Sequence, residues 1–304
     1  MADKKRVIIL MSTYNGEKYL EEQLDSIFKQ TYKNIQLLVR DDGSTDGTVA
    51  ILEKYEKEGN LKLITGKNLG YHVSFRQLLD MAGEYDYYSF ADQDDVWHKD
   101  KLKEAVKALN GMEQNKSALY FCDFDYHDKD MGFICHRDAL KRAINFRNSL
   151  VSFPSLGFAC VINNELRRKF LQVPAEYGFS HDYLALILAT AFGDVYYDSR
   201  PFAKYRRHGA NVSGDNINNF IKFQLWRMRN FFINDTVRFK EKWIALKEIY
   251  GNQLNLENVN ILNDFAYEGY KLTKAIKKAF SPKLYRETLF DEFALRFMFL
   301  VGKL

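Results

Sequence analysis

Three carboxylates lie close together in the segment from Phe90 to Trp97. Asp92, Asp94 and Asp95 fall within four positions and directly follow an apolar, aromatic run. Such a cluster repels itself unless a cation shares its charge. Mg²⁺ and Mn²⁺ prefer oxygen ligands and are often held by one or two carboxylates together with substrate phosphates. The cluster therefore indicates a metal and phosphate site, and the alternative is an acidic turn that caps a helix starting near Trp97 or His98.

The elements that must position this cluster alternate between strand and helix. Continuous apolar runs predict strands over residues 6–11, 35–39, 61–65 and 86–91. Helical periodicity predicts a helix after each of the first three strands, over residues 17–30, after Asp46, and over 73–82. This alternation is typical of a parallel sheet covered by helices on both faces, which binds ligands beyond the carboxyl ends of its strands. The polar loops that follow the strands should therefore meet at one edge, which favours the functional interpretation of the acidic cluster.

The rest of the chain is less regular. We expect strands over residues 118–124, 157–162 and 194–197, a helix over 182–192, and an irregular, substrate-facing insert over 125–156. The sequence after Gly214 is mostly helical in pattern. The predicted organisation is an α/β domain over residues 1–214 and a helical C-terminal extension over 215–304.

Composition limits the classes of function. The 304 residues carry a net charge of +4; residues 215–304 hold 15 Lys and Arg against 10 Asp and Glu, and the remainder hold 29 against 30. No dense basic stripe of the kind found in nucleic-acid-binding proteins is present. Three cysteines without CxxC spacing predict neither a disulfide framework nor a zinc site, and they fit a reducing cytoplasm. No stretch approaches the roughly 20 apolar residues of a membrane span.

Other side chains at the predicted edge suit a nucleotide. Tyr14 could stack on a base and its neighbours Thr13 and Asn15 could bond the base edge, although Asn15 could instead cap the next helix. Asp41 could accept a hydrogen bond from a pyrimidine N3–H, or form an ordinary turn. Lys67 and Arg76 are the cations best placed for phosphate, and the alternative is that they are solvated surface residues. No GxGxxG motif supports a dinucleotide fold.

Four motifs, in this order and spacing, resemble the family 2 glycosyltransferases of GT-A fold. They are Leu10–Gly16, Asp41–Asp46, Lys67–Gly70 and Asp92–Trp97. The resemblance covers roughly residues 5–215. The sequences of Phe90–Trp97 and Tyr205–Gly214 most resemble those of bacterial rhamnosyltransferases of surface-polysaccharide assembly.

The resemblance implies an inverting transfer from a nucleoside-diphosphate sugar with Mn²⁺ or Mg²⁺ as cofactor. Asp92 and Asp94 match the DxD motif that contacts ribose and the metal bridging the diphosphate, and Asp95 lies within reach of metal or acceptor. The implied metal ligands are Asp94, Asp92 and His208. The implied donor site comprises Thr13, Tyr14, Asn15, Glu17, Asp41, Lys67, Arg76, Asp92, Gln93, Asp95, Arg206 and Arg207.

The same resemblance supplies a catalytic base. The pair His181-Asp182 stands where the family carries its catalytic Asp, so Asp182 is the predicted base and His181 is expected to line the site. The alternative is that Asp182 only caps the following helix. Residues 205–214 are expected to form a mobile loop that brings His208 to the metal and Arg206 or Arg207 to the diphosphate. A basic surface turn is the alternative there.

The resemblance implies transfer of L-rhamnose from dTDP-rhamnose to a hydroxyl of a growing cell-surface glycan. A UDP-hexose or UDP-galactofuranose donor is the nearest alternative. A sugar-1-phosphate nucleotidyltransferase should carry a GxGTR-like loop where this chain has Ser12–Gly16. A non-catalytic nucleotide-sugar-binding module is a third alternative. The aromatic, basic segment 216–233 suggests core packing, peripheral membrane contact or self-association. We expect the protein in the cytoplasm, at the inner face of the cell membrane if it contacts lipid. We expect no nucleic-acid partner.

Overall fold

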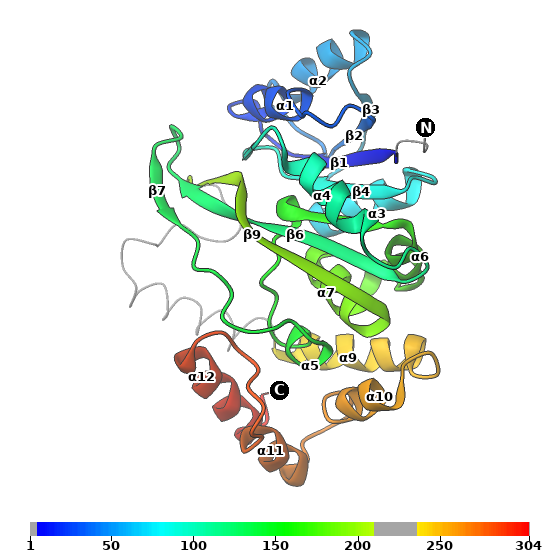
Figure 1. The fold of residues 1–304 in the computed structure, drawn as a ribbon, viewed down its shortest axis with the longest axis vertical. Coiled ribbons are helices and arrows are strands. Elements are labelled where there is room, and N and C mark those ends of the chain that lie inside the picture. The colour runs from blue at the N-terminus through cyan, green and yellow to red at the C-terminus, as the bar shows by residue number, and fades with distance from the viewer. Residues whose placement is uncertain (1–4, 210–235, 304) are drawn as a thin grey trace. The chain divides into compact units, whose positions relative to one another are not determined.

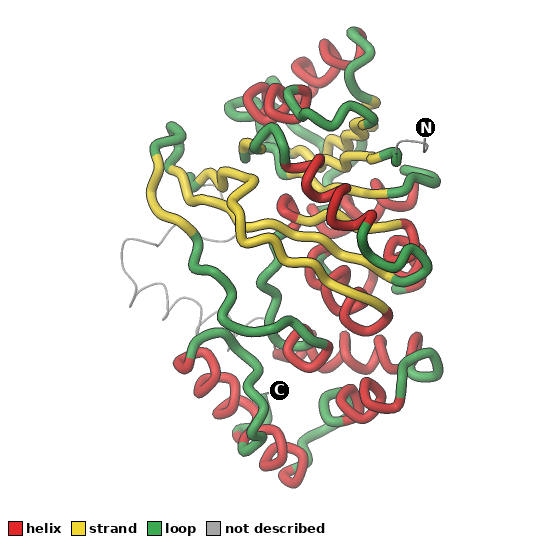
Figure 2. The backbone as a smooth tube through the Cα atoms, viewed as in Figure 1, coloured by secondary structure: helices red, strands yellow, loops and turns green. Residues whose placement is uncertain are grey.

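The computed structural model describes residues 5–209 and 236–303. The chain divides into two compact units, of which the first comprises residues 1–139 and 154–207 and the second comprises residues 140–153 and 208–304. The domain boundary expected at residues 214–215 lies outside the described residues. Figure 1 labels the helices and strands, and Figure 2 distinguishes them from loops.

The first unit is built on a single sheet of nine strands. These strands are β1 (Val7–Thr13), β2 (Ile35–Asp41), β3 (Lys62–Thr65), β4 (Tyr87–Ala91), β5 (Val96–Trp97), β6 (Ser117–His127), β7 (Phe133–His136), β8 (Cys160–Asn163) and β9 (Gly193–Arg206). Their order in the sheet is β3-β2-β1-β4-β8-β6-β9-β5, and β7 pairs with β6.

Six α-helices and two short 3₁₀-helices accompany this sheet in the part of the first unit that the structure describes. The α-helices are α1 (Leu20–Phe28), α2 (Thr48–Lys57), α3 (Tyr71–Met81), α4 (Lys101–Asn110), α6 (Asn164–Gln172) and α7 (His181–Phe192). The 3₁₀-helices are η1 (Gly157–Ala159) and η2 (Ala175–Tyr177). The helices predicted after the first three strands are confirmed as α1, α2 and α3.

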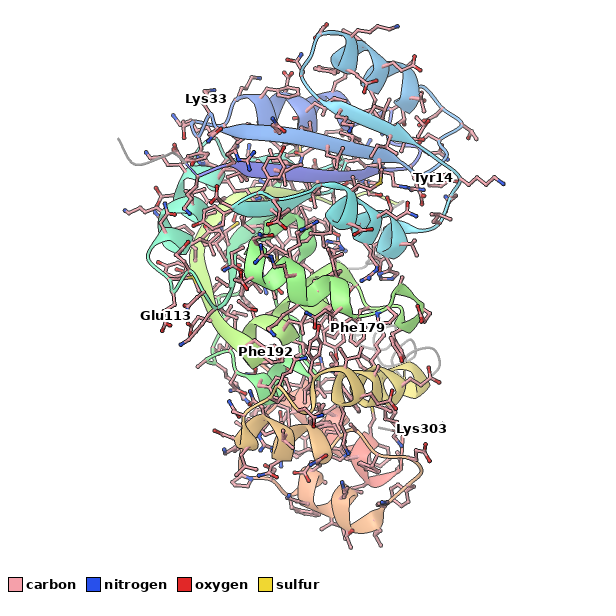
Figure 3. All side chains as sticks on the ribbon, turned by 90° about the vertical axis from the view of Figure 1, so that its right-hand side faces the viewer. Tyr14, Lys33, Glu113, Phe179, Phe192 and Lys303 are labelled. Carbon is pink, nitrogen blue, oxygen red and sulfur yellow. The ribbon has the colours of Figure 1, made fainter. Side chains whose placement is uncertain are left out.

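Strand direction decides which loops meet. Strands β1 to β4 are mutually parallel. Strand β8 runs antiparallel to both β4 and β6, and β9 runs parallel to β6, so β6 and β9 point the same way as β4. The ends of β1, β2, β3, β4, β6 and β9 therefore share one edge, here called the carboxyl rim. Tyr14 lies at this edge, whereas Lys33, which precedes β2, lies at the opposite one (Figure 3).

The core forms on both faces of the sheet because side chains alternate along each strand. Val7, Ile9 and Met11 of β1 pack in one cluster with apolar side chains of α1, α2 and α4. The intervening side chains meet the other layer, where Ser12 donates a 2.6 Å hydrogen bond to Ser74 of α3. Buried residues on both faces explain why the first strands have continuous apolar sequences.

Two expectations about the segments after the acidic cluster were wrong. No helix starts at Trp97, because Val96 and Trp97 form β5 and pair with Lys204 and Ala203 of β9; helix α4 begins at Lys101. Residues 125–156 are not uniformly irregular, since β6 continues to His127 and β7 returns along it. Both differences arise from pairing between residues far apart in the sequence or around a tight hairpin.

The regular secondary structure described in the second unit is all helical. Its helices are α5 (Phe146–Ser149), α9 (Thr236–Tyr250), α10 (Leu256–Asn263), α11 (Leu272–Ala279) and α12 (Leu289–Leu300). Trp243 is wholly buried; its indole nitrogen donates to the Leu150 carbonyl at 3.1 Å and its ring meets Phe265 edge-on. The helical C-terminal character is confirmed over residues 236–303. The helix expected over 216–233 lies outside the described residues.

Within the described ranges, no helix is long and apolar enough to cross a membrane.

Candidate active site

The acidic cluster forms the loop between β4 and β5 at the carboxyl rim. Asp92 and Asp94 are partly buried, and Asp95 is wholly buried. One carboxylate oxygen of Asp95 accepts a 3.1 Å hydrogen bond from the backbone N–H of Arg206, and its other oxygen has no hydrogen-bond partner among the described residues. The loop thus combines two partly buried carboxylates with a third that is held inside the protein.

The charges in this cluster act on one another. Burial, followed by the charges of Asp94 and Asp182, raises the pKa of Asp92 to about 7, and Lys101 opposes the shift. Burial, Asp94 and Asp92 also raise the pKa of Asp95 well above its usual range. Asp182 comes 90 positions after Asp92 in the sequence, yet its charge contributes to this shift. The fold therefore brings the predicted base and the predicted metal-binding carboxylates into one electrostatic site.

Lys101 is a member of this site that the sequence analysis missed. Its side chain is wholly buried; the Nζ atom lies 3.3 Å from the centroid of the Trp97 ring and 3.5 Å from Ser89 Oγ. Burial lowers the pKa of this ammonium to about 8, and the nearby carboxylates oppose that shift. The sequence held one indication that Lys101 is buried, because it stands one helical turn before the apolar residue Ala105, which is buried on the same side of α4. Lys101 supplies positive charge from inside the protein to a loop that is otherwise negative.

The raised pKa of Asp92 predicts how stability depends on pH in metal-free protein. Because the folded state holds the proton of Asp92 more tightly than the unfolded state, stability is lost as the pH rises from about 4 to about 7. Asp92→Asn removes this loss. The melting temperature of the variant in chelator, relative to wild type, should be higher at pH 8 than at pH 5. An equal difference at both pH values would contradict the assigned shift.

The loop after β1 is tied to the acidic loop. Gln93 receives a 2.8 Å hydrogen bond from the Tyr14 N–H and donates a 3.0 Å bond to the Tyr14 carbonyl. A Cβ at Gly16 would lie 2.3 Å from the Gln93 amide oxygen, so a larger residue at position 16 would displace the Gln93 amide from Tyr14. The Tyr14 ring is 47% exposed and could stack on a base. Gln93 thus holds Tyr14, the predicted base-stacking residue, beside the predicted metal site.

The loop after β2 joins the same network. Asn15 accepts from the Thr45 N–H at 2.8 Å, and Glu17 accepts from the Gly47 N–H. Asp41 is buried and already accepts hydrogen bonds from Thr13, from the Ser44 side chain, and from the N–H groups of Gly43 and Ser44. These bonds fill the usual acceptor capacity of a carboxylate. Contact between Asp41 and a nucleobase therefore stays a prediction, and it would require one of these hydrogen bonds to break.

A buried ion pair beneath this loop was not predicted. Arg40 and Asp42 are in contact with both side chains inside the protein, and Asp42 also accepts from the N–H groups of Leu69 and Gly70 at 2.9 and 2.8 Å. The Arg40 guanidinium reaches the carbonyl of Lys67 at 3.0 Å. This pair fixes the loop after β3 to the loop after β2, and it leaves the Lys67 side chain exposed at the rim.

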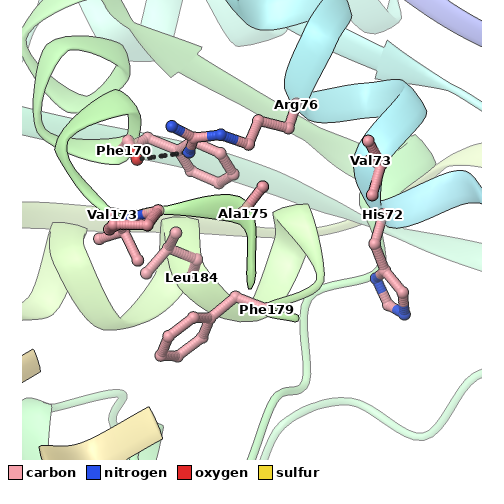
Figure 4. A pocket seen from close by; sticks show the side chains of 9 residues that line it. His72, Val73, Arg76, Phe170, Val173, Ala175, Phe179 and Leu184 are labelled. Atoms are coloured by element: carbon pink, nitrogen blue, oxygen red, sulfur yellow. Dashed lines mark hydrogen bonds between the residues drawn. The ribbon is translucent and has the colours of Figure 1, made fainter. Parts of the chain in front are cut away.

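Arg76 lies in a small, mostly apolar pocket bounded by α3, α6 and α7 (Figure 4). Its guanidinium donates to the carbonyls of Phe170 and Leu171 at 3.3 and 3.0 Å, which are at the C-terminal end of α6. Such carbonyls lack helical partners and attract cations. This contact gives Arg76 a structural task, so its role in phosphate binding stays a prediction.

Of the two arginines whose direction could not be read from the sequence, Arg206 points inward. It is 2% exposed and donates to the carbonyls of Asp94 and Lys129 at 2.8 and 2.9 Å, to the carboxylate of Glu22, and packs over the Tyr19 ring. Arg207 is half-buried near the Tyr126 ring, and His208 follows it at the end of the first described range. Arg206 therefore braces the acidic loop from behind.

Removing this brace should destabilise the protein. Arg206→Met would leave two carbonyls and the Glu22 carboxylate without their donor, and we expect a loss of about 2–4 kcal/mol in the free energy of unfolding. Lys204→Met, on the exposed side of the same strand, should change it by less than about 0.5 kcal/mol. Denaturant titration of the two variants measures both values. Equal stability of the two would show that Arg206 is dispensable to the loop.

The predicted base lies in the first turn of α7. Asp182 is partly exposed, and its carboxylate accepts a 2.8 Å hydrogen bond from the Tyr183 N–H. The preceding His181 is buried against Phe75 and Phe90, and neither ring nitrogen has a hydrogen-bond partner among the described residues. Burial lowers the pKa of His181 to about 4, so the ring is neutral at pH 7. The expectation that His181 lines the site stays a prediction, as does the role of Asp182.

A glycine makes room for His181. A Cβ at Gly157 would lie 2.0 Å from the Nε2 atom of His181, closer than any side chain could approach. Gly157 opens η1, which leads into β8, the strand between β4 and β6. The histidine ring thus joins the start of α7 to the centre of the sheet, and this contact fixes where Asp182 stands relative to Asp92.

The rim fits a divalent cation by its donor chemistry. Asp92 and Asp94 are neighbouring oxygen donors; burial and then the charge of Asp94 raise the pKa of Asp92, and a dication would favour the ionised form of both. Over the ranges that the structure describes, no cluster of three or more His, Cys, Asp or Glu side chains forms a ready-made metal shell. This arrangement is typical of a cation bound by one or two carboxylates together with substrate phosphates.

Comparisons of the sequence identify relatives. A family model described as "Glycosyl transferase family 2" matches residues 8–173. The dTDP-rhamnosyl transferase RfbG of Shigella flexneri is 30% identical over 270 residues, which are 80% of this chain and 88% of that protein. The matched region contains the loops of the carboxyl rim up to the acidic cluster.

Comparisons of the structure identify proteins of the same fold. S. aureus TarS 1-349 in complex with UDP-GlcNAc gives a TM-score of 0.55 at 21% identity, covering 86% of this chain and 80% of that chain. The mannosyltransferase PcManGT from Pyrobaculum calidifontis, in complex with GDP-Man and Mn²⁺, gives 0.51 at 17% identity, covering 99% and 85%. The GT-A fold expected from the sequence is confirmed.

Proposed function

Since this chain belongs to glycosyltransferase family 2, we propose that it transfers L-rhamnose from dTDP-rhamnose to a hydroxyl of a growing cell-surface glycan, with inversion. The observation that carries the proposal is the convergence of Asp92, Asp94 and Asp182 at the carboxyl rim. The choice of donor is supported by the relative RfbG, whose name assigns it dTDP-rhamnosyl transfer.

The donor nucleotide would bind across the first loops of the rim. The exposed Tyr14 ring offers a surface for thymine, and Thr13, Asn15 and Glu17 belong to the hydrogen-bonded network that shapes the loop around it. Lys67 is exposed on the loop after β3, where its ammonium can meet phosphate oxygens. Arg206 would act through the loop that it braces, and Arg207 is the arginine nearer to solvent.

Mn²⁺ or Mg²⁺ would be held by Asp94 and Asp92 together with the donor diphosphate, with His208 as a further ligand. Bound there, the cation would act as a Lewis acid that neutralises the charge developing on the departing diphosphate. The Mn²⁺ in the complex of PcManGT supports a divalent cation in this fold. Lys101 adds fixed positive charge behind the same carboxylates.

Asp182 would serve as the general base. The acceptor hydroxyl oxygen attacks the anomeric carbon from the face opposite the diphosphate, and its proton passes to the Asp182 carboxylate. The bond between the anomeric carbon and the diphosphate oxygen breaks, and its electron pair leaves with dTDP. The position of Asp182 at the N-terminus of α7 helps to keep its carboxylate ionised and ready to accept the proton.

Other functions make different predictions. A UDP-hexose or UDP-galactofuranose donor would use the same residues and differ only in the shape of the base and sugar pockets. The nucleotidyltransferase alternative is disfavoured, because the loop after β1 is Ser12–Gly16 and is closed by the Tyr14–Gln93 contact rather than open and rich in glycine. A non-catalytic binding module would not need a carboxylate at position 182.

The acceptor would be a glycan, carried on lipid if the protein acts at the inner face of the cell membrane. That location, in the cytoplasm and at the membrane surface, would bring the protein to such an acceptor. A homo-oligomer is compatible with the same chemistry. None of these roles calls for nucleic acid.

The direct test is nucleotide release from a panel of dTDP- and UDP-sugars with a rhamnose-bearing acceptor extract, in Mn²⁺ or Mg²⁺ and in chelator. We expect release from dTDP-rhamnose that chelator abolishes. Release from a UDP-sugar alone would support glycosyl transfer but would show that dTDP-rhamnose is not the donor. Donor binding is measured by calorimetric titration with the same panel, because a missing acceptor alone would prevent turnover. A protein that binds none of the donors would overturn the proposal.

A further inference from the structure

The apolar side chains of helix α12 are divided between two sides of the helix. Leu295, Met298 and Phe299 are buried, and Phe299 meets the rings of Phe265 and Tyr285 edge-on. This side forms the core of the second unit. The opposite side, which should be polar if water covered it, is apolar instead.

The exposed side of α12 and its first following residue consists of large hydrophobic residues. They are Leu289, Phe290, Phe293, Phe297, Leu300 and Val301. Phe293 and Phe297 are 72% and 57% exposed. Spacings of three and four residues place these side chains in one stripe along the helix. A continuous stripe of this kind, unlike scattered surface leucines, marks an interaction surface.

Helix α11 adds a second exposed stripe. Leu272, Ile276 and Phe280 recur every four residues and are all exposed. Helices α11 and α12 pack against each other, as Figure 1 shows, and Arg296 of α12 donates to the Ala279 carbonyl at 2.8 Å. The two helices therefore carry their apolar stripes as one rigid pair.

The charge around these stripes is positive. Residues 271–303 contain eight Lys and Arg and three Asp and Glu, a net charge of +5. The three acidic residues are engaged internally: Glu292 accepts from the Tyr285 N–H and from Arg296, Asp291 from Thr288, and Glu287 from the Lys141 N–H. Lys277 pairs with Asp264 at 2.8 Å, Arg296 pairs with Glu292, and Lys278 is buried. Lys271 and Lys283 are exposed, and these are the cations that we expect to meet an external partner.

We propose that the α11–α12 pair is a membrane-binding surface that inserts its apolar stripes into the headgroup region of an anionic bilayer. Exposed aromatic and aliphatic side chains beside lysines suit that region, where the rings reach the acyl boundary and the ammonium groups meet lipid phosphates. Helix α12 has 12 residues and is about 18 Å long, too short to span a hydrocarbon core of about 30 Å. It would therefore lie along the surface.

Charge decides between a bilayer and a second copy of the chain. Two copies meeting through this surface would bring two like-charged basic segments together, which costs free energy, whereas anionic lipid attracts both. The proposal goes beyond glycosyl transfer, and it does not depend on the donor, the metal or the acceptor.

The test is co-sedimentation of the full chain with vesicles. One set contains phosphatidylcholine alone and the other contains equal parts of phosphatidylcholine and phosphatidylglycerol. We expect binding to the anionic vesicles, weakened by salt. F293S/F297S should reduce the affinity by about tenfold or more, because two inserted rings are lost. K271Q/K283Q should reduce it severalfold.

Leu256→Ser is the matched control, since Leu256 lies on α10 of the same unit and is 77% exposed. It should bind as wild type does. Both Phe positions are exposed, so F293S/F297S should keep the melting temperature of the wild type. Failure of the wild type to bind anionic vesicles would overturn the proposal, as would unchanged binding by F293S/F297S. A dimer in sedimentation velocity that F293S/F297S converts to monomer would assign the surface to a second copy instead.

Discussion

Asp182→Asn should lower the turnover number for sugar transfer by about 10²- to 10⁴-fold, the range that general-base catalysis contributes. The amide cannot accept the acceptor proton at neutral pH. It can still accept the hydrogen bond that the Tyr183 N–H gives to the carboxylate, so the first turn of α7 should be preserved. Turnover measured with saturating donor and acceptor tests this directly.

Two measurements keep this result interpretable. The affinity for donor in the presence of metal should change little in Asp182→Asn, because the proposed base would contact the acceptor proton rather than the nucleotide. Product formation at the wild-type rate would remove Asp182 from the mechanism. His181 would not be the substitute, since its ring nitrogens are enclosed and its pKa is lowered to about 4.

Asp94→Asn should cause the second large loss. Asp94 is a partly exposed carboxylate of the rim, and its charge also raises the pKa of Asp92. If Asp94 is the proposed metal ligand, its loss should weaken metal-dependent donor binding by about tenfold or more and reduce turnover by about 10²- to 10³-fold. The metal concentration that gives half-maximal activity should rise in parallel, which a merely structural role would not produce.

Asp25→Asn is the control for loss of one negative charge. Asp25 is an exposed residue of α1 that pairs with Lys29. The variant should keep the wild-type metal dependence and donor affinity. A response of Asp94→Asn no larger than that of Asp25→Asn would show that Asp94 does not hold the cation.

The elements that carry the rim were predictable because their signals are local. All five residues of β4 are buried, and such a run of apolar residues followed by acids indicates a strand end in any parallel sheet. The same holds for β1 and β2. Their helices followed from periodicity, and the convergence of the loops followed from the parallel arrangement.

The parts that escaped prediction depend on distant partners. Trp97 belongs to a strand only because β9 lies beside it. Helix α6 was not predicted from the sequence, and it is held in part by a distant contact, since the Arg167 guanidinium is buried and donates to the Leu79 carbonyl. No pattern within the local sequence reports such a contact.

Within the site, the same distinction holds. The acidic residues and the His181-Asp182 pair were recognisable from their motifs, whereas their supports were not. Arg206 turns inward because the Asp94 and Lys129 carbonyls need a donor, and Lys101 is buried because Trp97 covers it. The groups proposed to react were therefore easier to predict from the sequence than the groups that hold them in place.

The supports also explain how such a strained cluster persists. Burial and the closeness of the three carboxylates disfavour their ionised forms in the metal-free loop, as the raised pKa values of Asp92 and Asp95 indicate. Lys101 offsets part of that cost at Asp92, and Arg206 offsets part of it at Asp95. The cluster is therefore kept available for a cation and a diphosphate, which is the trade of stability for function expected at a binding site.

The most direct measurement is a crystal structure of Asp182→Asn with dTDP-rhamnose and Mn²⁺, which needs no acceptor. Our account predicts Mn²⁺ between the Asp94 carboxylate and the diphosphate, thymine against Tyr14, and the anomeric carbon facing residue 182. A nucleotide bound away from the loops at residues 12–16 and 92–95, or a sugar whose anomeric carbon faces away from residue 182, would contradict it.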